Sequence, residues 1–407
     1  FKVTFSKWNV YLSNVKSLIV TMLAGWLGVI PLTVSRAQIQ LSPQAEISII
    51  TCGPDRNELY AAFGHSAIRV WDPAHGLDDA FNYGVFDFDQ PNFYLNFARG
   101  YLYYKLGVYY YSDFEAYYKR NQRFIHEQRL QLTPSQKQKL FDFLMWNARP
   151  ENQTYRYDYY HDNCASRIRD VLHQQLNGAV SWDSSYFKAE HSFRQKTDAY
   201  LKPLPWGDVG IDICLGMPID RTMNAWEYMF LPDYVESFVD HATIKHDSVS
   251  VSLVAEKKII FEPEPVEPWT ALVHPWVAFG IFLVFILFFS WRDWRRQQLS
   301  RWLDLILLGI TGLIGLLLAI LWIATDHYDA AWNLNLVWAF PLHLIACLLF
   351  FSKQATRLLR FYFLTCTILL VFILVFWWAL PQELNMYLVP IVAGLAIRCA
   401  LNWKLLQ

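Results

Sequence analysis

The sequence LDLILLGITGLIGLLLAILWIA, residues 303–324, decides the architecture of the C-terminal part of this chain. Its length is close to the roughly 20 apolar residues with which a helix crosses a bilayer. Other apolar stretches surround it, at residues 271–290, 334–352, 359–380 and 386–402. We therefore predict that residues 269–407 form an all-α membrane domain of about five transmembrane helices.

The connections between these stretches alternate in charge. The first and third are basic and contain Arg292, Arg295, Arg296 and Arg301, and then Lys353, Arg357 and Arg360. The second and fourth contain neither Lys nor Arg. Because basic loops stay in the cytoplasm, the residues before Trp269 are expected outside. The sequence thus predicts a multi-pass protein of a bacterial inner (cytoplasmic) membrane with its N-terminal domain in the periplasm.

The first residues have the pattern of an export signal. Lysines precede an apolar run at residues 17–34, and the small-x-small sequence Ser35-Arg36-Ala37 follows it. This pattern predicts a secretory signal peptide over residues 1–37, with an uncleaved N-terminal anchor as the alternative. An exported domain over residues 38–260 and a Pro/Glu linker over residues 261–268 would then lead into the membrane.

Composition agrees with this division and limits the partners. Charged residues make up 17% of the chain, below the roughly 25% that is usual for soluble domains. Residues 45–265, however, mix charged and apolar residues as globular domains do. The net charge of −1 gives no electrostatic attraction for nucleic acid. We expect the lipid bilayer, and no nucleic acid, among the partners.

The exported part mixes strand and helix signals. Runs rich in β-branched and aromatic residues predict strands at 47–51, 66–71, 81–88 and 101–111. Thr133-Pro134-Ser135-Gln136 is a capping box with Pro at the first helical position, and helical spacing continues to about Asn147. The sequence therefore predicts an α+β exported domain.

Cys164 is the candidate nucleophile of this domain. Asp162 or Asn163 is a good N-cap, and apolar residues then recur on one helical face. Cys164 would fall in the first helical turn, where the helix dipole stabilises a thiolate. His65 is the best candidate for its base, and His161 is the alternative. A structural role is the competing interpretation, because a lone Cys at a helix start is usually structural.

The other exported cysteines, Cys52 and Cys214, leave an odd thiol in an oxidising compartment. One arrangement pairs Cys52 with Cys214 and leaves Cys164 free. No CxxC spacing typical of a zinc site occurs. We expect neither a metal nor another cofactor.

Several segments together resemble a known family. They are Cys52-Gly53-Pro54, Phe63-Gly64-His65-Ser66-Ala67-Ile68-Arg69, the run from Asn82 to Phe88, Asp162-Asn163-Cys164-Ala165, and the run from Met229 to Tyr234. A His before an Asn-Cys pair that opens a helix resembles the circularly permuted papain-like superfamily, with its lecithin retinol acyltransferases and NlpC-like enzymes. The whole set is more similar to the DUF4105 family, some of whose members are implicated as lipoprotein N-acyltransferases.

The resemblance implies a permuted papain-like fold, Cys164 as the nucleophile and His65 as the base. Our choice for the polar residue that orients the His is Asn82, with His75 as the alternative. A substrate head group would be bound by Arg99, Tyr160 and Asp158, unless these residues only support the site.

The predicted function is that of a lipoprotein N-acyltransferase. A membrane phospholipid would be the acyl donor, Cys164 would carry the acyl chain as a thioester, and a diacylated lipoprotein would be the acceptor. The alternatives are a papain-like hydrolase of lipids or cell-wall peptides, and a non-catalytic membrane protein that binds a lipid or a protein.

Two polar residues within the apolar stretches need an explanation, since ionisable groups in a membrane are costly. His343 follows Pro341, and we expect it to bond a backbone carbonyl that the proline leaves free. Arg398 lies near the end of the last stretch, and we expect it to reach the membrane interface.

Overall fold

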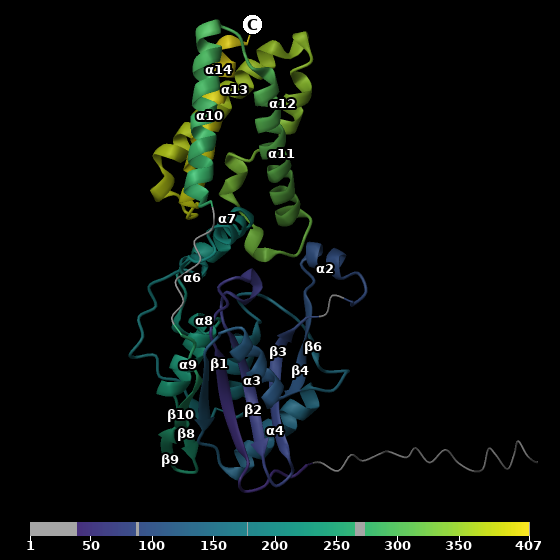
Figure 1. The fold of residues 1–407 in the computed structure, drawn as a ribbon, viewed down its shortest axis with the longest axis vertical. Coiled ribbons are helices and arrows are strands. Elements are labelled where there is room, and N and C mark those ends of the chain that lie inside the picture. Colours follow the sequence, from purple (N-terminus) through teal and green to yellow (C-terminus); the bar gives the residue numbers. More distant parts are fainter. Residues whose placement is uncertain (1–38, 87–88, 177, 265–272, 407) are drawn as a thin grey trace, which may run out of the picture. The chain divides into compact units, whose positions relative to one another are not determined.

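The computed structural model describes residues 39–86, 89–176, 178–264 and 273–406 (Figure 1). The predicted signal peptide and the second half of the predicted linker, residues 265–268, lie outside these residues. The exported part is built around a mixed α and β architecture, and the C-terminal part is helical. This confirms the predicted α+β domain followed by an all-α membrane domain.

One antiparallel sheet with the strand order β10-β5-β1-β2-β3-β4-β6 organises the exported domain (Figure 1). Its strands are β1 (Glu46–Cys52), β2 (His65–Asp72), β3 (Leu77–Val85), β4 (Tyr103–Tyr110), β5 (Ile125–Leu130), β6 (Thr154–Arg156) and β10 (Val254–Phe261). The first four correspond to the four predicted strands. A smaller sheet joins β7 (Val180–Ser181), β8 (Thr243–His246) and β9 (Val249–Ser252).

Helices cover both faces of the large sheet, because apolar side chains alternate along its strands. On one face Ile49 and Ile68 belong to a core shared with α4 (Pro134–Asn147), α5 (Cys164–Gln175) and α9 (Pro232–His241). On the other face Ile50 and Ala67 pack with residues of α3 (Tyr111–Arg120). The predicted capping box is confirmed, since the Thr133 side chain and Gln136 bond each other's backbone at the start of α4. The sheet thus provides a rigid frame for β2 and α5.

The remaining helices of the exported domain are short. They are α2 (Phe93–Arg99), α6 (Phe193–Leu201), α7 (Pro205–Cys214) and α8 (Ala225–Tyr228), with 3-10 turns η1 (Leu59–Ala61) and η2 (Met217–Asp220). Most of them follow α5 in the chain.

The membrane domain contains four helices that are long and apolar enough to span a bilayer within the described residues. They include α10 (Pro275–Arg296), α11 (Arg301–Ile323), α13 (Thr356–Val375) and α14 (Val389–Leu405). The third predicted stretch, 334–352, is instead broken into η4 (Leu334–Val337) and α12 (His343–Leu349). Pro341 cannot donate a helical hydrogen bond. The break is buried, as broken backbone in a membrane requires: Trp338 and Ala339 are almost fully enclosed.

Close packing against α11 accommodates this break. A Cβ atom added at Gly315 would lie 1.8 Å from the carbonyl oxygen of Ala339, so only a glycine permits the contact. His343 contacts a backbone carbonyl, as expected. Its ring lies 3.2 Å from the carbonyl oxygen of Trp338, three residues before Pro341. The ring also lies 2.5 Å from the Tyr362 hydroxyl.

The expectation for Arg398 is wrong. Its side chain is only 2% exposed and forms ion pairs with Asp304 at 2.7 Å and Asp293 at 3.0 Å. These carboxylates come from α11 and α10, so the guanidinium of α14 joins the ends of three helices. The sequence placed Arg398 near a span end but could not show that two carboxylates converge there.

Polar groups of the membrane domain complete helix α7 of the exported domain. The amide of Asn335 donates to the carbonyl of Asp212 at 3.0 Å, and that of Asn333 donates to the carbonyl of Ile213 at 2.8 Å. The amide of Gln382 donates to the carbonyl of Leu215 at 2.9 Å. The last carbonyls of a helix lack partners within it, and here the membrane domain supplies them.

Candidate active site

Cys164 is the first residue of helix α5, and Asn163 is the N-cap. The side-chain oxygen of Asn163 accepts hydrogen bonds from the backbone N–H groups of Ala165 at 2.9 Å and Ser166 at 3.0 Å. Its amide donates to the carbonyls of Tyr159 and Phe230, both at 2.8 Å. Of the two predicted N-caps it is therefore Asn163, and not Asp162, that fixes the start of the helix and the place of Cys164.

His65 is the first residue of β2 and stands opposite Cys52 of β1. The glycine before it is required, because Gly64 has a φ of +79° and a Cβ atom there would lie 2.8 Å from the carbonyl oxygen of Cys52. The Nε2 atom of His65 lies 2.5 Å from the side-chain oxygen of Asn82 on the neighbouring strand β3. Asn82 is therefore placed where it can orient the imidazole, and its role in catalysis stays a prediction.

The Cys164 thiol and the His65 ring interact as a pair. Burial opposes ionisation of the thiol, but the charge and hydrogen bond of His65 and the N–H groups of Ser66 and Ala165 hold the pKa of Cys164 below its ordinary value. Burial likewise disfavours a charged ring, yet the Cys164 thiolate and the bonds to Cys164 and Asn82 raise the pKa of His65. Each group thus stabilises the charged form of the other, relative to an isolated cysteine and histidine.

Residues that the sequence reading did not single out enclose the imidazole. The Tyr118 ring stacks on the His65 ring with centroids 6.2 Å apart and an interplanar angle of 14°. The Arg123 guanidinium lies over the Tyr118 ring, 4.6 Å from its centroid. The Nε atom of Arg123 donates to the carbonyl of Gly53 at 2.6 Å. No local pattern marks either residue, because α3, which contains Tyr118, and the segment after it, which contains Arg123, reach β2 only through the fold.

A cavity of about 920 Å³ contains Cys164, His65 and Asn82 in its lining. Most of its other walls are apolar or aromatic and include Tyr60, Phe86, Phe97, Tyr104, Phe114 and Tyr117. Gly84 lies close to the nucleophile and has a φ of +86°. A Cβ atom added to Gly84 would lie 3.6 Å from the Cβ atom of Cys164. The volume falls within the range of small-molecule sites, and an apolar wall with few polar groups is their usual composition.

The three predicted substrate-binding residues are not among the residues that line this cavity. Arg99 is an exposed residue at the end of α2. Tyr160 is 3% exposed, and its hydroxyl lies 3.2 Å from that of Thr197. Asp158 accepts hydrogen bonds from the N–H groups of Tyr160 and His161 and so shapes the turn before Cys164. Contact of these residues with a substrate stays a prediction.

The alternative histidines lie elsewhere. His161 is exposed beside Phe193 and is not part of the cavity lining. His75 lies in the turn between β2 and β3, where its Nδ1 atom is 2.8 Å from Asp72. The arrangement of the described residues therefore favours His65 and Asn82 over both alternatives.

Cys52 and Cys214 are free thiols, so the suggested disulfide between them is absent. Cys52 is buried in the middle of the large sheet, and burial raises the pKa of its thiol. Cys214 ends α7 and is half-buried, and burial raises the pKa of this thiol as well. The pKa of Cys164, in contrast, is lowered.

One acidic cluster among the described residues has the spacing of metal ligands. Carboxylate oxygens of Asp198, Asp208 and Asp212 lie within 4.8 Å of one another. Asp212, however, already pairs with Arg194 at 2.6 Å and accepts from Asn385 at 2.9 Å. Burial and the nearby carboxylates raise the pKa of Asp198 to about 9. The raised pKa favours the protonated form of Asp198, which reduces the repulsion among these carboxyl groups.

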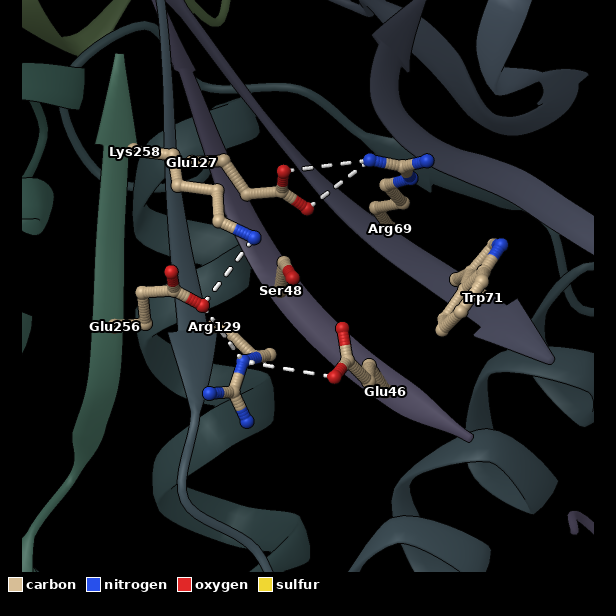
Figure 2. Close-up of a pocket in the computed structure, with 8 residues that line it drawn as sticks. All are labelled: Glu46, Ser48, Arg69, Trp71, Glu127, Arg129, Glu256 and Lys258. Carbon is tan, nitrogen blue, oxygen red and sulfur yellow. Dashed lines mark hydrogen bonds and ion pairs between the residues drawn. The ribbon is translucent and has the colours of Figure 1, made fainter. Parts of the chain in front are cut away.

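A second hollow, of about 200 Å³, lies on the sheet over β10, β5, β1 and β2 (Figure 2). Its charged side chains pair with one another: Arg69 with Glu127 at 3.2 Å, and Arg129 and Lys258 with Glu256 at 3.4 Å and 3.2 Å. Figure 2 shows the Arg69–Glu127 and Arg129–Glu256 pairs crossing between strands, whereas Glu256 and Lys258 both lie on β10. The charges thus satisfy each other on a solvated face, and we assign this hollow no chemistry.

Alkylation of Cys164 by iodoacetamide is expected to reach half its maximal rate at a lower pH than alkylation of Cys214. The thiolate is the reacting form, and the pKa of Cys164 is lowered whereas that of Cys214 is raised. Peptide mapping by mass spectrometry across a pH series measures both sites in one sample. The variant His65→Gln should move the Cys164 curve to higher pH, and an unmoved curve would show that His65 does not stabilise the thiolate.

The variant Asn82→Ala is expected to reduce kcat by roughly 10- to 100-fold, because a hydrogen bond to a charged group contributes about 1.5–3 kcal/mol. Asn82→Asp keeps an oxygen acceptor beside the ring Nε2 and is the matched control. It should retain more activity than Asn82→Ala and shift the alkaline limb of the pH–rate profile upward, since a carboxylate raises the pKa of His65 further. Equal rates for both variants would contradict an orienting role.

Comparisons with known proteins agree with the two-part architecture. Residues 37–196 match the family model of the Lnb N-terminal periplasmic domain, and residues 267–407 match that of the Lnb transmembrane domain. No curated protein and no solved structure matches the chain. The chain therefore consists of a periplasmic domain followed by a membrane domain. The matches name neither DUF4105 nor the papain-like superfamily, so that part of the resemblance stays a prediction.

Proposed function

We propose that this chain, two parts of which match the Lnb periplasmic and transmembrane domains, is a lipoprotein N-acyltransferase of the bacterial inner membrane. The observation that carries the proposal is the Cys164–His65–Asn82 constellation in the wall of a cavity of about 920 Å³ lined mostly by apolar and aromatic side chains. A thiolate there can attack an ester, and the cavity can hold a fatty chain.

In the first half-reaction the Cys164 thiolate attacks the ester carbonyl of a membrane phospholipid. The carbon–oxygen bond to the glycerol breaks, and the His65 imidazolium gives its proton to the departing oxygen. The products are an acyl-thioester on Cys164 and a lysophospholipid. Asn163 already occupies the N–H groups of Ala165 and Ser166, so the N–H of Cys164 itself is the helix-terminal donor for the oxyanion.

In the second half-reaction the α-amine of a diacylated lipoprotein attacks the thioester. His65, now neutral, takes a proton from the amine, and the carbon–sulfur bond breaks. This forms the amide and returns the thiolate–imidazolium pair. An acyl chain that fills the largely apolar and aromatic cavity would displace water from the thioester and so favour this acceptor.

Mass spectrometry of lipoprotein N-termini tests the proposal. The full chain is expressed in a host that lacks N-acylation, and the lipoproteins are expected to gain one acyl chain on the α-amine. If the lipoproteins stay diacylated while free fatty acid accumulates, the protein is a lipid hydrolase. If neither product forms although the protein is present in the membrane, catalysis of either kind is wrong.

A further inference from the structure

Helix α2 exposes an unusual amount of apolar surface for its length. None of its seven residues is buried. Tyr94 is 76% exposed, and Leu95 and Phe97 are each 51% exposed. Apolar side chains gathered in this way on one short element are typical of a surface that contacts a partner or a membrane.

The end of α2 is bonded to the loop that follows transmembrane helix α11. The N–H of Asp326 donates to the carbonyl of Arg99 at 2.8 Å, and the His327 ring lies 3.1 Å from the carbonyl oxygen of Phe97. Asp326 comes three residues after Ile323, the last residue of α11. Gly100 makes this contact close, since a Cβ atom there would lie 2.8 Å from the backbone of Asp326.

An ion pair also joins the loop after α11 to the exported domain. Arg156 of β6 pairs with Asp326 at 2.5 Å, and Arg156 stands opposite Tyr103 at the start of β4. The loop of Asp326 contains no Lys or Arg and lies on the periplasmic side in the orientation given above. Helix α2 is thus held against the loop at the end of α11, which is the periplasmic end in this orientation.

One residue of α2 also belongs to the catalytic cavity. Phe97 is half exposed and lines the cavity that contains Cys164. Tyr94 and Leu95 do not line it and face outward. The helix therefore has an outward apolar surface on one side and the cavity on the other.

We propose that α2 lies in the outer-leaflet interface of the bilayer and forms the edge over which a lipid chain passes sideways into the cavity. The outward side chains Tyr94 and Leu95 contact lipid, and Phe97 contacts the passing chain. The membrane contact stands on the geometry alone, whereas the passage of an acyl chain rests on the proposed function. The occupant to which we commit is phospholipid, and not a second copy of the chain or a protein partner.

Fluorescence quenching tests the membrane contact without any activity. The full-length variants Tyr94→Cys and Tyr110→Cys, both in a Cys164→Ser background, are labelled with an environment-sensitive fluorophore and placed in phospholipid nanodiscs. Tyr110 is the matched control, because it is 71% exposed but lies seven residues along β4 from Tyr103, about 23 Å away at 3.3 Å per residue. The unsubstituted background protein, labelled in parallel, gives the signal from the remaining cysteines.

The label at position 94 should be quenched several-fold more than the label at position 110 by lipids that carry a nitroxide near the head group. Equal quenching of the two labels would overturn the membrane contact. A change in the fluorescence at position 94 that follows the protein concentration, with no quenching by the nitroxide lipid, would show a protein interface. That result would also overturn the membrane contact.

A double variant, Tyr94→Ser with Leu95→Ser, tests the passage of the chain. Transfer from bilayer phospholipid should fall by about tenfold, as the loss of more than 1 kcal/mol of apolar contact implies. Single-turnover acylation of Cys164 by a water-soluble short-chain ester should stay at the wild-type rate. If the double variant loses activity equally with phospholipid and with the water-soluble ester, α2 does not guide the lipid chain into the cavity. If the wild-type protein transfers no acyl chain but the label at position 94 is still quenched by lipid, the proposed function is wrong and the membrane contact stands.

Discussion

Replacement of Cys164 by Ala is expected to lower N-acyl transfer by about 10⁴-fold or more, as loss of the nucleophile does in other covalent catalysts. No other described thiol can replace it: Cys52 and Cys214 are absent from the cavity lining, and burial raises the pKa of each. The measurement is the rate of acyl transfer to a lipoprotein peptide in proteoliposomes, together with mass spectrometry for the acyl-enzyme.

Cys214→Ala is the matched control for Cys164→Ala. It also removes one half-buried thiol near a helix end, but one that lies outside the cavity, so activity should stay close to that of the wild type. Cys164→Ser should bind donor lipid without forming a thioester. Full activity of Cys164→Ala would show that the cavity acts without a cysteine nucleophile, and the proposed mechanism would then be wrong.

Arg194→Met is expected to destabilise the protein by about 3–5 kcal/mol, because removal of one partner of a buried ion pair leaves the other charge uncompensated. The Arg194 side chain is 1% exposed and pairs with Asp212 at 2.6 Å and Asp220 at 2.8 Å, which are themselves 4% and 5% exposed. It also donates to the carbonyls of Leu215 and Gly216. Its loss therefore affects residues 212–220, a segment of the exported domain that contacts the membrane domain.

Arg221→Met provides the comparison, since this side chain is 50% exposed and pairs with Glu227. An exposed ion pair contributes about 0–1 kcal/mol. Thermal unfolding in detergent, followed by tryptophan fluorescence, should show a much lower midpoint for Arg194→Met than for Arg221→Met. Similar midpoints for the two variants would mean that the two buried carboxylates find other partners when Arg194 is lost.

Local sequence signals predicted the elements that surround the nucleophile. Strands β1 to β4, the capping box of α4 and the position of Cys164 at a helix start all follow from patterns within about ten residues. The pairing of His65 with Asn82 followed from the resemblance and from the expectation that their strands are neighbours. These predictions depend on short-range preferences, which the folded structure preserves.

Long-range contacts account for what the sequence did not reveal. Strand β5 pairs with β1 and β10 pairs with β5, in each case across a long separation in sequence. Tyr118 likewise reaches His65 from a helix more than fifty residues away in the chain. The burial of Arg398 depends on carboxylates from two other helices. The break at residues 338–342 was missed because hydropathy records composition, whereas Pro341 and the close contact at Gly315 determine the backbone path.

The completion of α7 by Asn333, Asn335 and Gln382 limits how the protein can be divided or recombined. A periplasmic fragment expressed alone would leave the carbonyls of Asp212 and Ile213 without these amide donors. It would also uncover Val209, which packs in the same core as the membrane helices. A chimera that exchanges one half for that of a relative would need matching amides at these positions. The two halves are therefore expected to be inherited and engineered as a single unit, although their sequences look like independent modules.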